Sequence, residues 1–442
     1  MKRRKVLILG AAGRDFHNFN CYFRNNSEYE VVAFTATQIP DIHGRKYPGS
    51  LAGDLYPEGI PIWDETEMAE IIKKYHIDLV VFSYSDVNYD YLMHRAALVN
   101  ACGADFMLMG TNETQIESSK PVIAVCATRT GCGKSQTTRA ISDILRERNL
   151  KVVAIRHPMP YGDLEAQKVQ RFATLEDLKK HECTIEEMEE YEPHIDNGVI
   201  VYAGVDYEAI VREAEKEADV ILWDGGNNDM SFYKADLYIT VADPHRPGHE
   251  LKYYPGETNL RLADIVIINK IDSATEENIE IVRKNTKDVN PTAKIIEATS
   301  PITVEDPELI NGKKVLVVED GPTLTHGEMK IGAGVVAAQR MGASELIDPR
   351  PYTVASIEAT YKKYPDIGTL LPAMGYGDQQ MKDLETTIAN VPCDSVIIGT
   401  PIDLRRVIDI NQPSTRVKYD LGEDGAKALE SSINKLLEDK GI

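Results

Sequence analysis

Short apolar runs alternate along the chain with longer segments in which apolar and charged positions recur at helical spacing. This alternation predicts parallel strands joined by helices, as in α/β proteins. In the first part of the chain we expect strands at 6–9, 31–35 and 79–82, and a helix at 65–75. Pro, Gly and Tyr are frequent at 40–61, which predicts a long loop.

A second series of strands begins after the polar stretch 111–120, which we interpret as a domain boundary. The strands are expected at 122–127, 152–155, 220–223, 237–241, 265–268, 294–297 and 315–318. The very acidic segment 165–197 is expected to be helical and to form an insertion or lid, although a solvated charged surface explains its charge equally well. Helices after Gly332 and at 354–363, with strands at 369–372 and 395–398, predict either a third subdomain or a continuation of the same sheet.

The strand at 122–127 leads into a Gly-rich loop and then a helix, which is the arrangement of a P-loop. Glycines let successive backbone N–H groups face phosphate oxygens, and the helix N-terminus adds its positive end. Lys134 is expected to reach the β- and γ-phosphates, and the Ser135 hydroxyl to ligate Mg²⁺. The expected nucleotide-binding residues of the loop are Thr130, Gly131, Cys132, Gly133, Lys134, Ser135 and Gln136. Thr128 replaces the first Gly of the general pattern.

Two later strand ends carry residues expected to complete the nucleotide site. Asp224 ends an apolar strand and precedes two glycines, as in a Walker B strand, and is a second candidate ligand of Mg²⁺. Asn269, Lys270 and Asp272 match the Asn-Lys-x-Asp motif that contacts a purine base in GTPases. The bound nucleotide is expected to be ATP, and GTP remains an alternative. The loop also resembles that of the MinD, dethiobiotin synthetase and metallochaperone GTPase class. In the MinD branch of that class a signature Lys stands where this chain has Arg129. Arg129 is therefore a catalytic candidate with Lys134 and Asp224, because a guanidinium can stabilise charge on a transferring phosphoryl group.

Further basic and polar residues follow other strands, where ligands of open α/β sheets bind. We expect them to contact an anionic, phosphorylated small substrate. The candidates are Arg14 and His17 after the first strand, Arg156 and His157, Arg246, and Asp320 and His326. For the turn that contains Arg14, NAD binding, phosphate binding and a purely structural role remain equally open.

Composition narrows the classes of partner. The chain of 442 residues carries a formal net charge of −21, which argues against nucleic acid and anionic lipid as partners. No stretch approaches the roughly 20 apolar residues of a membrane span. Six cysteines without a paired spacing predict reduced thiols and a cytoplasmic location.

Taken together, the motifs resemble the cyclic 2,3-diphosphoglycerate synthetase family. The resemblance rests on the stretches 13–20, 127–135, 191–194, 223–228 and 319–327. It implies closure of an intramolecular phosphoanhydride in 2,3-diphosphoglycerate, driven by ATP and Mg²⁺. A GTPase of the metallochaperone or regulatory kind is the alternative, favoured by the Asn-Lys-x-Asp motif, and an NAD-binding oxidoreductase fused to an NTPase is a third hypothesis.

The predicted fold class is therefore α/β, in three parts. A Rossmann-like domain is expected at 1–118, a P-loop NTPase domain with a mainly parallel sheet at 119–345, and a C-terminal α/β extension at 346–442 that could belong to the NTPase domain. Proteins of this P-loop class often form dimers, so a homodimer is expected.

Overall fold

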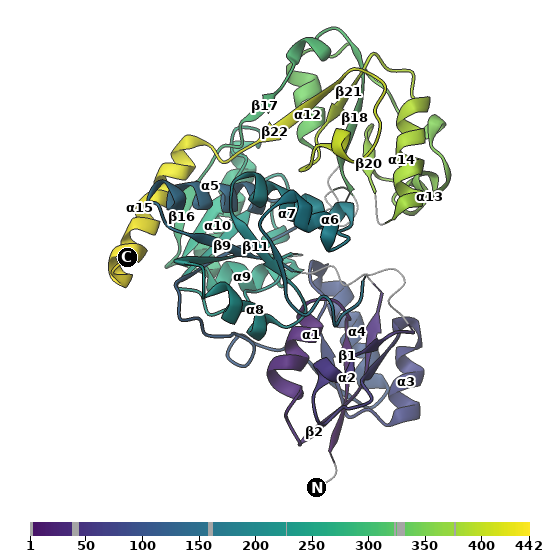
Figure 1. Ribbon diagram of the computed structural model, residues 1–442, viewed down its shortest axis with the longest axis vertical. Helices are drawn as coiled ribbons and strands as arrows, with labels where there is room; N and C mark the ends of the chain where they lie inside the picture. The colour runs from purple at the N-terminus through teal and green to yellow at the C-terminus, as the bar shows by residue number, and fades with distance from the viewer. Residues whose placement is uncertain are drawn as a thin grey trace.

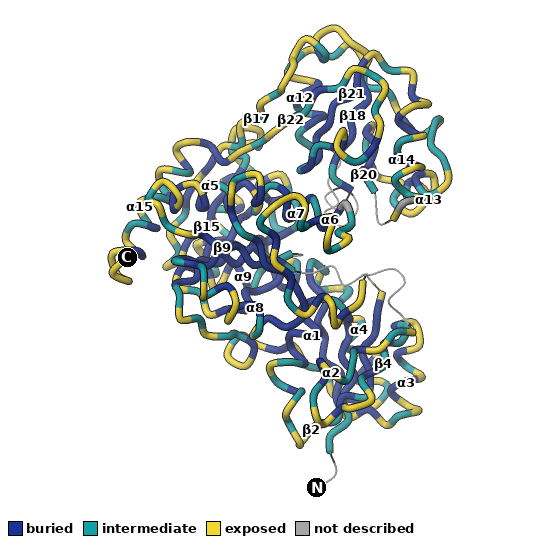
Figure 2. Tube along the Cα trace, viewed as in Figure 1, coloured by how far each residue is buried: buried dark blue, intermediate teal, exposed yellow. Residues whose placement is uncertain are grey.

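The described residues form three large β-sheets that follow one another along the long axis of the molecule, and a two-stranded sheet of β6 (Val87–Asn88) and β14 (Tyr253–Tyr254) (Figure 1). The structure is a computed structural model and describes residues 3–37, 44–157, 162–226, 228–321, 324, 332–374 and 377–442. Each sheet has its own buried centre with exposed residues around it (Figure 2). The predicted α/β class with mainly parallel sheets is confirmed.

The N-terminal sheet has the strand order β3-β4-β2-β1-β5-β7, and its pairs are parallel except β3 with β4. Its strands are β1 (Arg4–Leu9), β2 (Tyr29–Ala36), β3 (Lys46–Tyr47), β4 (Ile60–Asp64), β5 (Leu79–Phe82) and β7 (Asp105–Met107). Its helices are α1 (Arg14–Asn18), α2 (Gly49–Ala52), α3 (Met68–Tyr75) and α4 (Tyr89–Ala101). Val6 and Ile8 enter one apolar cluster, whereas Leu7 and Leu9 enter another, because successive side chains of a strand point to opposite faces. The apolar run of β1 thus reflects a strand covered on both faces.

The central sheet has the order β10-β11-β9-β12-β8-β13-β15-β16, parallel except for β10. Its strands are β8 (Val122–Ala127), β9 (Val152–Ile155), β10 (Gln170–Phe172), β11 (Ile200–Ala203), β12 (Val220–Trp223), β13 (Leu237–Ala242), β15 (Ile265–Ile268) and β16 (Lys294–Glu297). The helices are α5 (Lys134–Glu147), α6 (Leu175–Lys180), α7 (Ile185–Asp196), α8 (Tyr207–Ala214), α9 (Gly256–Leu262) and α10 (Glu276–Val289). Strand β8 lies between β12 and β13, so the loop that follows it opens at the middle of the carboxyl edge.

The third sheet has the order β17-β22-β21-β18-β19, and β20 also pairs with β18. Its strands are β17 (Ile302–Val304), β18 (Lys314–Asp320), β19 (Glu345–Leu346), β20 (Leu371–Ala373), β21 (Ser395–Ile398) and β22 (Ser414–Tyr419), with helices α12 (Ala333–Arg340), α13 (Ala355–Lys363) and α14 (Asp378–Asn390). The strand expected at 315–318 in the P-loop sheet was therefore misplaced, because it pairs with β19, β20 and β21. Its apolar residues pack in a cluster made mainly of residues 310–417.

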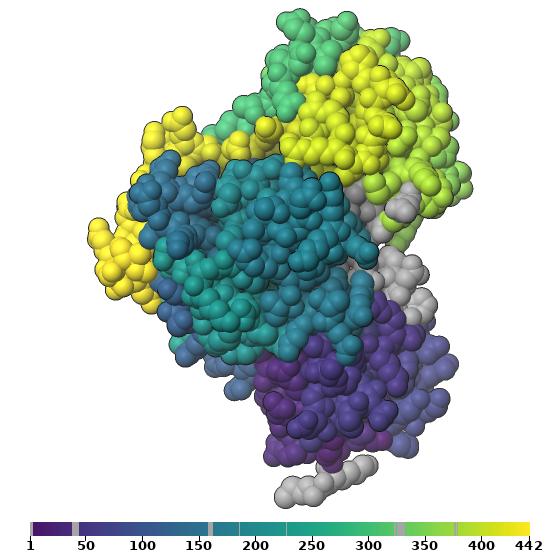
Figure 3. All heavy atoms as spheres, in the orientation of Figure 1, coloured from purple at the N-terminus to yellow at the C-terminus, as the bar shows by residue number. Residues whose placement is uncertain are grey.

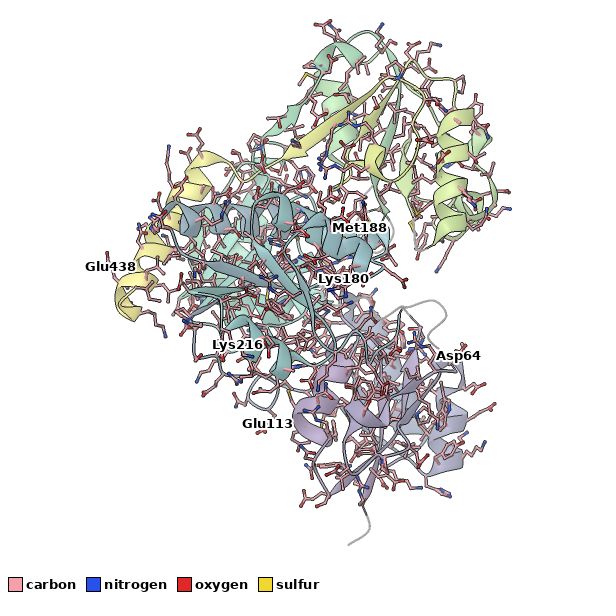
Figure 4. All side chains as sticks on the ribbon, in the orientation of Figure 1. Asp64, Glu113, Lys180, Met188, Lys216 and Glu438 are labelled. Atoms are coloured by element: carbon pink, nitrogen blue, oxygen red, sulfur yellow. The ribbon has the colours of Figure 1, made fainter. Side chains whose placement is uncertain are left out.

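Segments distant in sequence join the three sheets. The C-terminal helix α15 (Glu423–Lys440) returns to the central sheet, where Leu429 and Ile433 share a core with Ile141. In Figure 3 its yellow spheres lie against the blue and teal central part. Met188 of α7 packs against both the third-sheet core and a cluster around Phe172, and Figure 4 places it at that junction. Among the residues that the structure describes, no helix has the length and apolar character needed to cross a membrane.

Glu319 is a buried acid near the end of β18. Its Oε1 accepts a hydrogen bond from the Val335 backbone N–H at 3.1 Å, and a Cβ at Gly399 would lie 2.5 Å from its Oε2. Burial raises the pKa of Glu319 to about 8. The folded protein therefore holds a proton on this group over a pH range in which the unfolded chain has lost it.

The first prediction concerns this proton. Because the folded-state pKa lies above the unfolded value, the folding free energy contributed by Glu319 is lost as pH rises from about 4.5 to 8. The Glu319→Gln variant should remove that loss, so its free energy of unfolding should fall less between pH 5 and 8 than that of the wild type. Urea unfolding at several pH values measures this, with exposed Glu308→Gln as the control. Equal slopes for wild type and Glu319→Gln would contradict the assignment.

The second prediction tests the return of the C-terminal helix. Leu429 has no exposed surface, so Leu429→Ala should leave a cavity and lower the free energy of unfolding by about 2–5 kcal/mol. The exposed Lys435→Ala on the same helix should change it by less than about 0.5 kcal/mol. Equal denaturant midpoints for the two variants would show that α15 does not contribute to the core.

Candidate functional site

The loop between β8 and α5 has the backbone that a phosphate cradle requires. Gly131 and Gly133 have φ angles of 81° and 110°, in the left-handed region that favours glycine. A Cβ at Gly133 would also clash with the side-chain amide of Asn269. Helix α5 begins at Lys134, so its free N–H groups face the end of the loop. The expected nucleotide-binding residues from Thr130 to Gln136 thus lie together at an anion-binding helix terminus.

The Asp224 carboxylate lies fully buried beside this loop and contacts three basic side chains. Lys134 Nζ donates to its Oδ1 at 2.6 Å, while Arg156 NH1 and His194 Nε2 lie 2.5 Å and 3.0 Å from its Oδ2. Burial alone would raise the pKa of Asp224, but Arg156 and Lys134 outweigh burial and hold that pKa well below its usual value. Asp224 is therefore a permanent anion next to the phosphate cradle, and we call these four residues the Asp224 centre.

Two residues of the Asn-Lys-x-Asp segment donate hydrogen bonds to backbone carbonyls of the P-loop. Asn269 Nδ2 donates to the Cys132 carbonyl at 2.9 Å, and Lys270 Nζ donates to the Gly131 carbonyl at 2.6 Å. Arg246, expected to bind substrate, contacts Cys132 Sγ at 3.5 Å and Asp243 Oδ2 at 3.2 Å, and its contact with substrate stays a prediction. In a separate position, Asp272 accepts a hydrogen bond from the Ser300 backbone N–H at 2.8 Å.

Arg129 connects the P-loop to the N-terminal part of the chain. Its Nε donates to Asp86 Oδ1 at 2.7 Å, its NH1 lies 2.7 Å from His249 Nδ1, and its guanidinium lies 3.5 Å from the Tyr253 ring centre. Asp86 Oδ2 also accepts the backbone N–H of Thr130 at 3.3 Å. Asp86 comes this close because β6 (Val87–Asn88) pairs with β14 (Tyr253–Tyr254). A transferring phosphoryl group as the partner of Arg129 stays a prediction.

A second group of expected site residues meets between the N-terminal and central sheets. Arg14 Nε lies 3.4 Å from Asp229 Oδ1, and His157 Nε2 lies 3.3 Å from Asp229 Oδ2. His17 stacks on Phe232 with ring centres 4.0 Å apart. Burial lowers the pKa of His17 to about 3 and that of His157 well below its usual value, and the charge of Arg14 lowers both further. The two imidazoles are therefore neutral, and Arg14 is the cation of the group.

The third sheet places its expected residue against helix α7. Asp320 follows Glu319 on β18 and lies by Glu189 of α7; burial, and after it the charge of Asp320, hold the pKa of Glu189 well above its usual value. His326, also expected to contact substrate, lies outside the described residues.

Helix α7 supplies residues that the sequence did not assign to the site. His194 contacts Asp224, and Glu190 forms an ion pair with Arg156. Thr184 and Glu187 form a capping box at the start of this helix. That local signal identifies the helix from sequence, but not which of its faces turns toward the P-loop.

Comparison with known proteins gives matches at three levels. The family model described as "Cyclic 2,3-diphosphoglycerate synthetase, P-loop domain" matches residues 197–299, which include Asp224 and Asn269 but not the Gly-rich loop. The arginine synthetase ArcE of Thermococcus kodakarensis is 65% identical over 98% of this chain and 97% of its own. The cyclic 2,3-diphosphoglycerate synthetase of Thermococcus sibiricus is 32% identical over 25% of this chain and 26% of its own. The ATP complex of LpxK from Aquifex aeolicus has a TM-score of 0.42 and 13% identity over 78% of this chain and 95% of its own.

Fold and site together define a P-loop protein that binds a nucleoside triphosphate. The chain belongs to the cyclic 2,3-diphosphoglycerate synthetase family, as the sequence motifs predict, and its full-length relative is a synthetase as well. It is accordingly an enzyme of the ligase type.

The third prediction tests the Asp224 centre. Because Lys134 is the basic residue of the P-loop, Lys134→Ala should weaken nucleotide binding at least about ten-fold. Arg156 and His194 remain to compensate Asp224, so the variant should stay folded. Titration calorimetry with a non-hydrolysable ATP analogue measures the affinity, and exposed Lys216→Ala is the control. An unchanged affinity would exclude Lys134 from the nucleotide site.

Proposed function

We propose that this chain is an ATP- and Mg²⁺-dependent arginine synthetase. The observation that carries the proposal is its 65% identity, over 98% of its length, to the arginine synthetase of Thermococcus kodakarensis. The P-loop and the Asp224 centre supply what a synthetase needs, namely a phosphate cradle beside a permanent anion.

The residues present fit a nucleotide with its metal ion. The glycine at 133 lets the Asn269 and Gln136 side chains pack against the loop, and Gln136 Nε2 and Asn269 Oδ1 are buried there without a hydrogen-bond partner. The Ser135 hydroxyl and the Asp224 carboxylate would hold Mg²⁺, which when bound neutralises charge on the phosphates. Lys134 would then exchange its contact with Asp224 for the phosphates, while Arg156 and His194 keep the carboxylate oriented.

In arginine formation, ATP would activate an oxygen atom of the precursor so that nitrogen can replace it. A guanidinium group differs from a ureido group by a nitrogen in place of the ureido oxygen. To make arginine from a ureido precursor, this oxygen must be displaced, and it is a poor leaving group. Transfer of the γ-phosphoryl group to that oxygen makes it leave as phosphate, so that an amine nitrogen can form the new C–N bond. The products are arginine, ADP and phosphate, and the chain's residues contribute mainly positioning and charge stabilisation.

Cyclisation of 2,3-diphosphoglycerate is the second candidate function, favoured by the family-model match and by the buried arginines Arg14 and Arg156. The environment of those arginines weighs against it. Arg156 is engaged by Asp224 and Glu190, and Arg14 lies by Asp229. The neutral His17 and His157 add no positive charge for a substrate with several negative charges. A cationic or zwitterionic substrate suits these carboxylates better. The homodimer and the cytoplasmic location stay predictions.

The fourth prediction separates these functions. With ATP and Mg²⁺, phosphate release should require L-citrulline and ammonium, the simplest precursors that differ from arginine by one oxygen, and L-arginine should accumulate. Replacing them with 2,3-diphosphoglycerate should give no release above background. Colorimetric phosphate assay and amino-acid chromatography measure both products. Turnover with 2,3-diphosphoglycerate alone would establish the second candidate, and turnover of GTP alone would establish the GTPase alternative.

A further inference from the structure

The Arg14–Asp229 pair is buried, yet its groups are incompletely satisfied. Both side chains are only 4% exposed, and their ion-pair distance is 3.4 Å, from Arg14 Nε. Arg14 NH2 donates to the Met230 carbonyl at 2.5 Å, whereas NH1 is buried without a hydrogen-bond partner. Burial raises the pKa of Asp229 to about 7 although Arg14 lowers it. An acid and a base thus lie side by side, and the arginine keeps one buried N–H group without a partner.

Other polar atoms without partners surround this pair. Trp223 Nε1 and Tyr207 Oη are buried and have no hydrogen-bond partner, and buried His157 Nε2 makes no hydrogen bond beyond its 3.3 Å approach to Asp229 Oδ2. Their rings contact Phe232, with centres 4.6 to 4.9 Å apart, so the atoms belong to one cluster. Buried polar atoms are rarely left unsatisfied, and several in one place indicate a ligand that completes them.

The fold places this cluster beside the nucleotide site. Arg14 begins α1 directly beyond β1, and Asp229 follows β12 through Gly225 and Gly226. The carboxyl edges of the N-terminal and central sheets therefore face one another here. Trp223 and His157 are the sequence neighbours of Asp224 and Arg156, so the cluster adjoins the Asp224 centre.

We propose that Arg14 and Asp229 bind the two charged groups of an amino-acid substrate. Arg14 NH1 receives the α-carboxylate, and Asp229 receives the α-ammonium group. The side chain of the bound amino acid then extends toward the Asp224 centre. This inference rests on the proposed function, because it names the site that recognises the amino-acid end of arginine or its precursor.

The paired charges distinguish this ligand from a phosphorylated acid. A substrate that carries only negative charge gains from Arg14 but is repelled by ionised Asp229. A zwitterion gains from both groups. Neutralising Asp229 should therefore weaken binding of an amino acid, whereas it should leave unchanged or strengthen binding of a polyanion.

The test compares three ligands on the full-length protein with a non-hydrolysable ATP analogue bound. L-Arginine carries both charged groups, agmatine lacks the carboxylate, and 5-guanidinopentanoate lacks the α-ammonium group. The wild type should bind L-arginine at least about ten-fold more tightly than either analogue. Arg14→Gln should lose the preference over agmatine only, and Asp229→Asn the preference over 5-guanidinopentanoate only. Both variants should bind the nucleotide as the wild type does.

The control is Arg24→Gln, which alters another Arg–Asp pair, with Asp206 at 3.5 Å, outside the cluster. It should retain both preferences, and Arg14→Lys replaces Arg14→Gln where the latter does not fold. Binding of L-arginine with both preferences intact in Arg14→Gln and Asp229→Asn would overturn this inference and leave the proposed function standing. No binding of L-arginine by the wild type, with turnover of 2,3-diphosphoglycerate, would overturn both.

Discussion

The structure depends most on compensating one buried negative charge. Asp224 has no exposed surface, and an isolated carboxylate in such a place is strongly disfavoured. Its compensation comes from three elements, because Lys134 begins α5, Arg156 follows β9 and His194 lies on α7. The central sheet, the P-loop helix and the acidic segment that contains α7 must therefore meet at this point for the protein to fold. The same requirement holds Lys134 of the P-loop in place.

Neighbouring positions at the strand ends serve two different sites. Asp224 and Arg156 face the P-loop, whereas Trp223 and His157 contact Phe232 in the adjoining cluster. Successive side chains of extended backbone point in opposite directions, so two strand ends supply residues to both groups. The chain thereby brings the Asp224 centre and the Arg14–Asp229 pair close together without a dedicated linking element.

Local sequence pattern was sufficient for most of the strands and for the P-loop. Strands β8, β9, β12, β15 and β16 begin and end where predicted. The first four are buried parallel strands, which are continuous apolar runs between polar turns, whereas β16 is an edge strand with exposed charged ends. The same pattern does not say which sheet a strand joins, so β18 was placed in the wrong sheet. The partners of Arg129 were also missed, since Asp86 reaches it only through the pairing of β6 with β14. The return of α15 to the central sheet is likewise a long-range contact that periodicity does not contain.

The Asp86–Arg129 contact requires the N-terminal and central parts to keep matching residues at their junction. Asp86 accepts hydrogen bonds from both the arginine and the Thr130 amide of the P-loop, and the adjoining β6 strand pairs with the central part. If the N-terminal part were replaced by that of a relative, the replacement would need an equivalent of residues 86–88. Without it, the P-loop would lose the hydrogen bonds that Asp86 accepts. Recombination between family members is therefore constrained at this joint, whereas the third sheet, with its separate core, is free of that constraint.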